Sequence, residues 1–420
     1  MYSHIGVKVS KFVSTFLILC ILLPFTGCAA KKELSDISIA DIMGIDIAKD
    51  GNVKVSVLAI TPTGSNTTMG SSEQSTVWLG TATGASLVEA ITNLNGIATK
   101  KIVWFHNRYI IISSKYAKNS LNELADYLIR NRETRFLSGL LITEGDVLDM
   151  LQVPADIQKS LSDEIEGMAK NSLLWSKGYV RDLKDFMSNF AEKDTDNLIG
   201  KIGYNMSFRN TYSTNREIIR KEYWVNRAFG LAFIEGSAVI RRDRFVGFLS
   251  GTETRGCLWI MNKVKLGSIT VNEGAGKGTI AVTILNSGSS IIPEMQDGKI
   301  NINIKLKASV SLTETSSKFQ SLNKNEIKKI EDLVKNEIIK EMNSGTHKAQ
   351  TEYDADVFNF KNYIKIKYPS KWKTMEEDWY TIFPTLEIKY DVKVTLLRFG
   401  KILDPLFDYG ENSNNSTKNK

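Results

Sequence analysis

Alternating and helical hydrophobic patterns follow one another in the first part of the chain. Apolar and polar residues alternate over 41–48 and 53–61, and an Asp-Gly pair at 50–51 separates the two segments. This arrangement is a strong signal for a β-hairpin. Ser86 and Ser120 each precede a helical pattern and stand three residues before a glutamate, which is typical of a capping box. We therefore expect a sheet with packed helices.

The later part of the chain shows the same two periodicities in a different order. A helix is expected over 324–343, because its apolar positions recur every three or four residues. Gly345 is predicted to end this helix. Further strands are expected at 238–240, 245–249, 267–271, 278–285, 300–312 and 386–399. The polar segment 189–197 separates the two parts and is interpreted as a solvated linker.

The amino terminus has the pattern of an export signal. Lys8 and Lys11 precede an apolar core over 12–23, which as a helix would span about 18 Å, less than the roughly 30 Å hydrocarbon core of a bilayer. Small residues then lead to Cys28, in a Thr-Gly-Cys that resembles the bacterial lipobox, with Phe25 where leucine is usual. We predict a signal peptide and a diacylglyceryl lipid on Cys28. The alternative is an ordinary signal peptide that ends in a chance cysteine.

Composition narrows the chemistry further. The chain has 420 residues, a formal net charge of +7, three cysteines and three histidines. This leaves little material for a disulfide framework, a metal site or a histidine-based triad. The surplus of basic residues is too small to indicate a nucleic-acid-binding surface. We expect no enzyme activity, no nucleic-acid binding, no metal and no cofactor apart from the lipid on Cys28.

Several short motifs are better explained by structure than by chemistry. The glycine-rich segment 274–279 lacks the spacing of a phosphate loop and is interpreted as a hairpin turn. The acidic segment 194–197 lacks the later positions of a calcium loop and is interpreted as a solvated linker. Residues 241–244 are expected to form an exposed charged turn. His106 and Cys257 are expected to be structural.

Several segments in a fixed order carry a resemblance to a known family. They are 33–46, 107–112, 128–135, 235–239, 245–249, 253–256, 368–372 and 379–394. In this order, the chain resembles the C subunit of bacterial spore germinant receptors, the GerAC-type lipoproteins, up to about residue 402. Ala29 and Cys257 depart from the family pattern, which often has an aromatic residue at each position.

The resemblance implies an α+β protein of three successive domains, each a mixed or antiparallel sheet with packed helices. It also implies a lipid-anchored protein on the extracytoplasmic face of the spore inner membrane. Its expected partners are two integral membrane subunits, A and B, with the small nutrient germinant bound by another subunit. The predicted boundaries are 1–27 for the signal peptide, 28–187, 188–265 and 266–404 for the N-terminal, middle and C-terminal domains, and 405–420 for a disordered tail.

The charged residues in the matching segments are candidates for a structural or interface network. Arg130 and Glu133 stand three residues apart at the end of a predicted helix, and Arg135 follows them. Glu253 and Arg255 have the same two possible roles. A buried or half-buried ion-pair network is the first interpretation, and a contact with a partner is the second.

Two other classes of protein are alternatives to this interpretation. A solute-binding lipoprotein of a transporter would need a ligand cleft between two lobes, and it would bind a small ligand saturably. An envelope hydrolase would turn over peptidoglycan fragments. The sequence has no Gly-x-Ser-x-Gly elbow and no His-Glu-x-x-His metal motif, but a pair of carboxylates could also serve a glycosidase.

Overall fold

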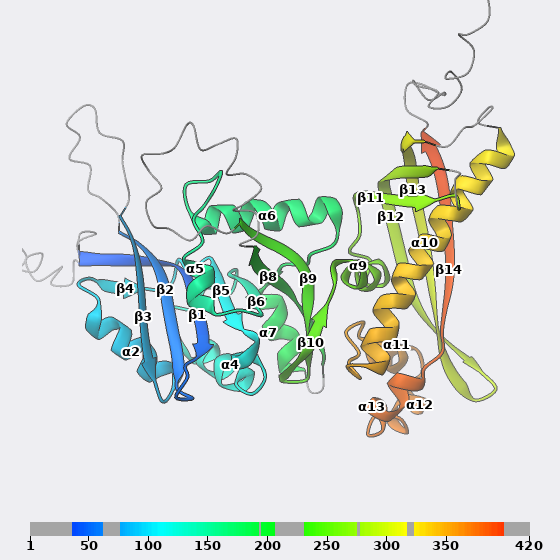
Figure 1. Ribbon diagram of the computed structural model, residues 1–420. Helices are drawn as coiled ribbons and strands as arrows, with labels where there is room; N and C mark the ends of the chain where they lie inside the picture. The colour runs from blue at the N-terminus through cyan, green and yellow to red at the C-terminus, as the bar shows by residue number, and fades with distance from the viewer. Residues whose placement is uncertain are drawn as a thin grey trace, which may run out of the picture.

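The computed structural model describes residues 36–61, 76–192, 195–205, 231–274, 278–316 and 323–398. The described strands form two sheets with helices packed on them (Figure 1), so the predicted α+β class is confirmed. The predicted signal peptide, Cys28 and the predicted tail lie outside these residues, and no structural statement is made about them.

The first sheet contains ten described strands of mixed direction. Its main order is β10-β9-β8-β6-β5-β1-β2-β3, and β4 and β7 pair with β1 and β6. The strands are β1 Ile37–Ile47, β2 Val53–Thr61, β3 Thr76–Gly84, β4 Lys101–Val103, β5 Tyr109–Ser113, β6 Gly139–Thr143, β7 Arg181–Asp182, β8 Asn197–Asn205, β9 Leu231–Arg241 and β10 Arg244–Leu249.

Helices cover both faces of the first sheet. They are α2 Leu87–Ile97, α3 Ser114–Ala117, α4 Leu121–Arg130, α5 Val147–Leu151, α6 Leu161–Trp175 and α7 Leu183–Ala191. On β1, Met43 and Ile45 are buried in the cluster that holds α2, α3, α4 and α7. Ile42 points the other way, into the cluster with α5 and α6. The central strands are therefore apolar on both faces, as their near-continuous hydrophobic runs require.

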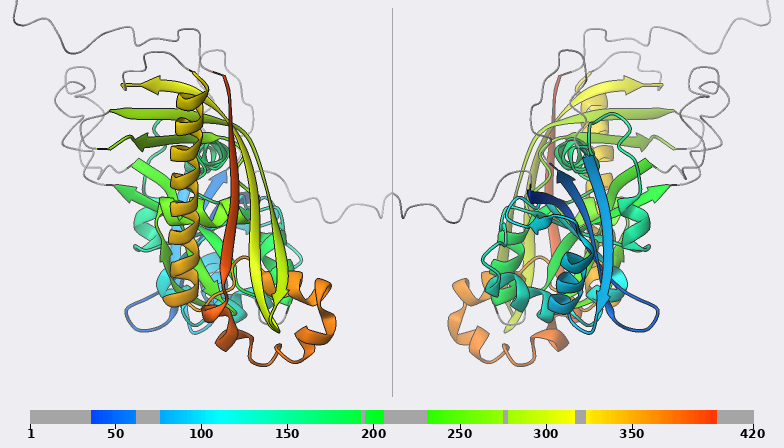
Figure 2. Two further views of the ribbon diagram at one scale, coloured as in Figure 1. Left: turned by 90° about the vertical axis from the view of Figure 1, so that its right-hand side faces the viewer. Right: turned by 90° about the vertical axis from the view of Figure 1, so that its left-hand side faces the viewer.

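The second sheet has the order β11-β12-β13-β14. Its strands are β11 Gly267–Asn272, β12 Thr279–Gln296, β13 Lys299–Thr315 and β14 Ile388–Arg398. The long helix α10, Lys324–Thr351, runs along this sheet (Figure 2) and buries Ile330, Val334 and Ile338 against it. The remaining helices are α9 Gly251–Ile260, α11 Phe360–Lys367, α12 Pro369–Lys373, α13 Trp379–Ile382 and the 3-10 helix η3 Phe383–Thr385.

The hairpin predicted around the Asp-Gly pair is confirmed. β1 pairs with β2 in antiparallel register, and Gly51 has a φ of +86°, a backbone conformation that glycine adopts without strain. The predicted capping box at Ser86 is half formed, because its side chain accepts from the Glu89 N–H. At Ser120 no side-chain cap bond forms, although α4 begins at the next residue.

Two other expectations about single elements are wrong. Gly345 does not end the long helix, which continues to Thr351. A Cβ at this position would lie 2.7 Å from the Glu253 carbonyl oxygen of α9, so the glycine serves a close helix approach. The supposed solvated linker at 194–197 is also buried where it is described, since Asp196 and Asn197 are 3% and 1% exposed.

The strands of the expected middle domain do not form a sheet of their own. β6 pairs with β8 through Leu141↔Gly200, and β8 pairs with β9. The first sheet therefore continues through the middle segment, while α9 leads to the second sheet. The residue boundaries given for the three domains stay a prediction.

Candidate functional site

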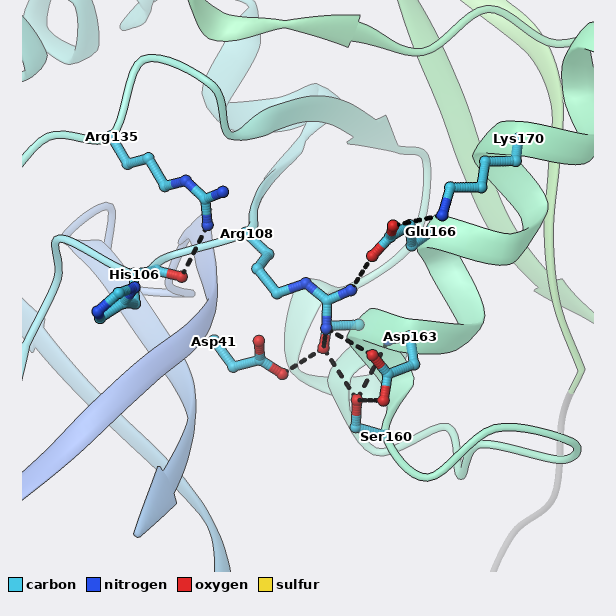
Figure 3. Close-up of polar contacts among 9 residues, drawn as sticks. Asp41, His106, Arg108, Arg135, Ser160, Asp163, Glu166 and Lys170 are labelled. Atoms are coloured by element: carbon cyan, nitrogen blue, oxygen red, sulfur yellow. Dashed lines mark hydrogen bonds and ion pairs between the residues drawn. The ribbon is translucent and has the colours of Figure 1, made fainter. Parts of the chain in front are cut away.

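A charged cluster joins the first sheet to α6 (Figure 3). Arg108, just before β5, donates from Nη1 to Asp163 Oδ1 at 2.7 Å and to Ser162 Oγ at 2.9 Å. Its Nη2 pairs with Glu166. Ser162 in turn donates its hydroxyl hydrogen to Asp41 of β1. One guanidinium thus contacts two carboxylates of α6 and, through a serine, a buried carboxylate of the sheet.

The contacts and burial in this cluster also shift the pKa values of its ionisable groups. Burial raises the pKa of Asp41, while the Ser162 hydroxyl and the charge of Arg108 oppose that rise. The hydrogen bond from Arg108 holds the pKa of Asp163 below its usual value. Burial raises the pKa of Tyr109 to about 12, so its hydroxyl stays protonated at neutral pH.

An open pocket of about 490 Å³ lies beside this cluster, where β5 and β6 begin and α6 and α9 approach. Its charged lining consists of Arg108, Arg135, Glu166, Lys170, Asp182 and Lys263, and its apolar lining includes Tyr109, Leu137, Val180 and Leu258. Four cations against two carboxylates favour an anionic or amphipathic occupant.

The lining gives no sign of a catalytic set. None of the residues lining this pocket is a histidine or a cysteine. Within the described part of the chain, no group of three or more His, Cys, Asp or Glu residues could hold a metal ion. The arrangement can bind a ligand and orient it; the described side chains do not form a nucleophile–base pair there.

The structure places Arg130, Glu133 and Arg135 in three separate contacts. Arg130 donates from Nε to both carboxylate oxygens of Asp126, at 2.8 and 2.9 Å, on the exposed face of α4. Glu133 accepts from the Trp104 N–H at 3.1 Å. The expected pairing of Arg130 with Glu133 is not formed, because α4 ends at Arg130 and Glu133 no longer follows the helical spacing.

The Arg135 side chain lines the pocket and makes one long polar contact with the described chain. Its Nη1 lies 3.5 Å from the His106 carbonyl oxygen (Figure 3), and its side chain is exposed. His106 itself is also exposed and stacks obliquely on Phe105. Arg135 has no ion-pair partner among the described residues, so contact with a ligand or a partner would break no such pair.

Glu253 and Arg255 both connect α9 to α10, through different partners. Glu253 closes a capping box with Ser250 and pairs with Lys348 of α10 at 3.3 Å. Arg255 is buried and donates from Nε to Glu341 Oε2 at 2.9 Å, with a second bond between Nη2 and Oε1. The geometry supports a structural role for Arg255.

Two buried aspartates, Asp196 and Asp356, lie where the two sheets meet. The sequence alone did not indicate their role. Asp196, before β8, accepts from the Arg242 N–H at 2.7 Å and from the Asp356 N–H at 2.6 Å. The Tyr380 hydroxyl of α13 donates to the same carboxylate at 3.1 Å. The residues next to Asp196 in the sequence are polar and do not indicate burial. The groups that bury and bind its carboxylate lie 46 to 184 positions away in the chain.

Glu341 was missed for a related reason. It lies among lysines and acids on a largely polar helix, yet it is 1% exposed. Its position fits neither the apolar stripe of α10 nor any motif, although it follows Ile338 by three residues. Cys257 is buried as expected, and burial raises the pKa of its thiol.

Comparison with known protein families identifies the class of protein. Residues 30–203 match the model of the spore germination protein N-terminal domain, and residues 235–400 match the model "Spore germination B3/ GerAC like, C-terminal". Together the two models cover most of the chain. The chain belongs to the GerAC-type family of spore germination proteins and has a germinant-receptor-related role.

The similarity extends over whole proteins. The chain is 24% identical to spore germination protein B3 of Bacillus subtilis over 399 residues, which cover 94% of this chain and 98% of that protein. It is 23% identical to spore germination protein KC of the same organism, over 95% and 98% of the two chains. The crystal structure of the GerBC protein shares the fold, with a TM-score of 0.54 and 19% identity over 84% of this chain and 96% of that one.

Proposed function

We propose that this chain is the lipid-anchored, non-enzymatic C subunit of a nutrient germinant receptor. The observation that carries the proposal is the pair of family matches, which cover residues 30–203 and 235–400. Membership in a complex with integral A and B subunits follows from the family resemblance, as does a germinant site on another subunit.

The membrane location in this proposal depends on the amino terminus. The charged start, short apolar core and Thr-Gly-Cys sequence support cleavage before Cys28 and lipid attachment to its sulfur. No helix in the described part of the chain is long and apolar enough to cross a bilayer. We propose the extracytoplasmic face of the spore inner membrane as the site of action, with two acyl chains as a stable anchor.

Spores that lack the chain test this function. They would be exposed to a panel of nutrients, one at a time, and to a trigger that bypasses nutrient receptors, with loss of refractility as the readout. We expect no response to one nutrient class and a normal response to the bypass trigger. Loss of both responses would place the protein in spore assembly or downstream of the receptors, against the proposal.

The open pocket gives one reason to keep solute binding as a second candidate. It has room for a small nutrient and carries Arg135 without an ion-pair partner in the described chain. Titration calorimetry of the purified chain with each nutrient would decide this. Saturable binding that is abolished by Arg135→Ala would favour the solute-binding function; no heat with any nutrient would remove it.

A further inference from the structure

Three large apolar side chains stand exposed together where α6 meets the segment before β11. Leu174, Trp175 and Leu266 are 55%, 40% and 41% exposed. They are adjacent because the Ser176 hydroxyl donates to the Leu266 carbonyl oxygen at 2.9 Å. A Cβ on Gly267 would also lie within 3.6 Å of the Leu174 and Trp175 carbonyl oxygens. Single exposed leucines are ordinary, whereas exposed apolar residues on neighbouring segments are a feature of contact surfaces.

Exposed lysines border this group on both elements. Lys170 stands one turn before Leu174 on α6, and Lys263 and Lys265 precede Leu266. Lys170 pairs with Glu166 at 2.6 Å. Lys265 donates to two neutral oxygens, and no carboxylate partner of Lys263 or Lys265 occurs among the described residues. The border of the apolar group is therefore basic.

The chemistry of this surface fits the interface of a bilayer. Tryptophan has a large apolar ring and one N–H group, a combination that favours the headgroup region. The Trp175 indole forms no hydrogen bond with the rest of the described chain. Leucines beside tryptophan can insert shallowly, while lysine side chains extend toward anionic headgroups. A protein partner with acidic residues would use the lysines, but it would not require a tryptophan with a free N–H group.

The proposed lipid anchor would hold the chain close to a bilayer. Eight residues separate Cys28 from Ile37, where β1 begins, and a chain of that length spans at most about 28 Å. In Figure 1, β1 begins at the left end of the ribbon, and α6 and β11 lie further to the right. The anchor would therefore keep the chain near the bilayer without fixing which face meets it.

We propose that Leu174, Trp175 and Leu266, bordered by Lys170, Lys263 and Lys265, form a second membrane contact that inserts into the headgroup region of an anionic bilayer. This inference rests on the proposed function for the presence of the protein at a membrane. It adds an orientation: the end of α6 and the segment before β11 lie against the lipid, and α11 to α13 point away from it.

A fluorescent probe at the surface tests the proposal in the full-length lipidated chain. Leu174→Cys would be labelled with a nitrobenzoxadiazole dye, since Cys257 is fully buried. The chain would be reconstituted into phosphatidylcholine vesicles with or without phosphatidylglycerol. We expect a blue shift and strong quenching by nitroxide-labelled lipids, both several-fold greater with phosphatidylglycerol.

Matched variants control for position and for charge. Ile366→Cys on α11 is equally suited to labelling, because Ile366 is 81% exposed and α11 lies in the lower part of Figure 1. Its probe should stay in water. Lys263→Gln with Lys265→Gln should remove the effect of phosphatidylglycerol, whereas Lys328→Gln with Lys340→Gln on α10 should leave it unchanged.

The outcomes separate this proposal from the proposed anchor. A chain that carries lipid and stays with the vesicles, but whose Leu174 probe remains in water, would overturn the second contact alone. Equal quenching at Leu174 and Ile366 would also overturn it, because adsorption would then be unspecific. If mass spectrometry finds no lipid on Cys28, the anchor is wrong. In a chain that also carries Cys28→Ser, so that Cys28 takes no dye, quenching of the Leu174 probe by added phosphatidylglycerol vesicles with nitroxide-labelled lipids would still decide the second contact.

Discussion

Arg255 of α9 and Glu341 of α10 form a buried ion pair at the junction of the two sheets. Their side chains are 8% and 2% exposed, and the Trp259 indole N–H also donates to Glu341, at 2.9 Å. The Arg255 guanidinium uses a third donor for the Ser268 carbonyl oxygen of β11 at 2.9 Å. The pair is therefore satisfied on both sides, which is what a buried charge requires.

Removing one partner of this pair should strongly destabilise the protein. We expect Arg255→Ala to cost about 3–5 kcal/mol in the free energy of unfolding, because Glu341 would be left buried without its cation. Urea unfolding followed by circular dichroism would measure this. The double variant Arg255→Met, Glu341→Leu should lose less than the single one, since it leaves no unpaired charge.

The exposed pair Arg130–Asp126 is the matched control for that experiment. Arg130 is 77% exposed, and pairs of this kind contribute about 0–1 kcal/mol. Arg130→Ala should therefore leave the unfolding curve almost unchanged. Equal losses for Arg255→Ala and Arg130→Ala would contradict the structural role of the buried pair.

Close contact between α9 and α10 also depends on glycine. A Cβ on Gly256 would lie 1.9 Å from the Glu341 carbonyl oxygen, closer than any real contact. We expect Gly256→Ala to push the helices apart and to cost about 1–3 kcal/mol. Gly96→Ala on α2 is the control, because nothing lies within 4 Å of its added methyl group. It should be neutral or slightly stabilising. A neutral Gly256→Ala would show that the helices are less tightly packed.

Local signals in the sequence predicted many elements, and the reasons for success and failure are specific. The Asp-Gly turn and the stripe of α10 depend on neighbours within a few residues, so the β1–β2 hairpin and the helix were predictable. The prediction that Gly345 ends the helix was wrong because, in sequence, a glycine that ends a helix cannot be told from a glycine where two helices cross. Arg255 and Glu341 are 86 positions apart, and no periodicity indicates that they meet.

The candidate site was less predictable than the fold. Arg135 was selected because of a family motif, and it does line the pocket. Arg108 was within a matching segment, but its contacts with Ser162, Asp163 and Glu166 come from α6, more than fifty positions later. Which charges meet there depends on how α6 packs over the sheet, and a single sequence does not encode that in a readable pattern.

The two arginines of this site should respond differently to substitution. Arg108→Ala would leave Asp163 and Asp41 without their cation and Glu166 with Lys170 alone, so we expect a clear loss of thermal stability and a lower level of folded protein. Arg135→Ala removes only a 3.5 Å contact with a carbonyl oxygen and should change the melting temperature little. Differential scanning fluorimetry of the two purified variants would measure both.

Arg135 then gives a test of function that does not depend on folding. If Arg135→Ala accumulates normally in spores and impairs nutrient germination, the residue contacts a ligand or a partner. Arg135→Lys would show whether charge alone is enough. A large loss of folded protein in Arg135→Ala would instead favour the structural interpretation given by the sequence.

The two buried acids at the junction predict a dependence of stability on pH. Burial raises the pKa of Asp356 to about 7 and the pKa of Asp196 to about 6, although backbone N–H donors oppose the rise at both. In the unfolded chain both groups titrate near 3.8. Between these values the native state holds protons that the unfolded state has released. Stability should therefore be greatest at low pH within this window and fall as pH rises toward about 7.

Asp356→Asn should reduce that slope, because asparagine does not ionise and still offers one oxygen to the N–H groups of Phe360 and Lys361, which the native carboxylate binds at 2.9 and 3.0 Å. Urea unfolding of the wild type and the variant at about pH 5 and about pH 8 would show it as a smaller difference between the two free energies. Asp332→Asn on the exposed face of α10 is the control and should keep the wild-type slope. An unchanged slope in Asp356→Asn would mean that this carboxyl group is already ionised in the native protein at the lower pH, and that its hydrogen bonds outweigh its burial.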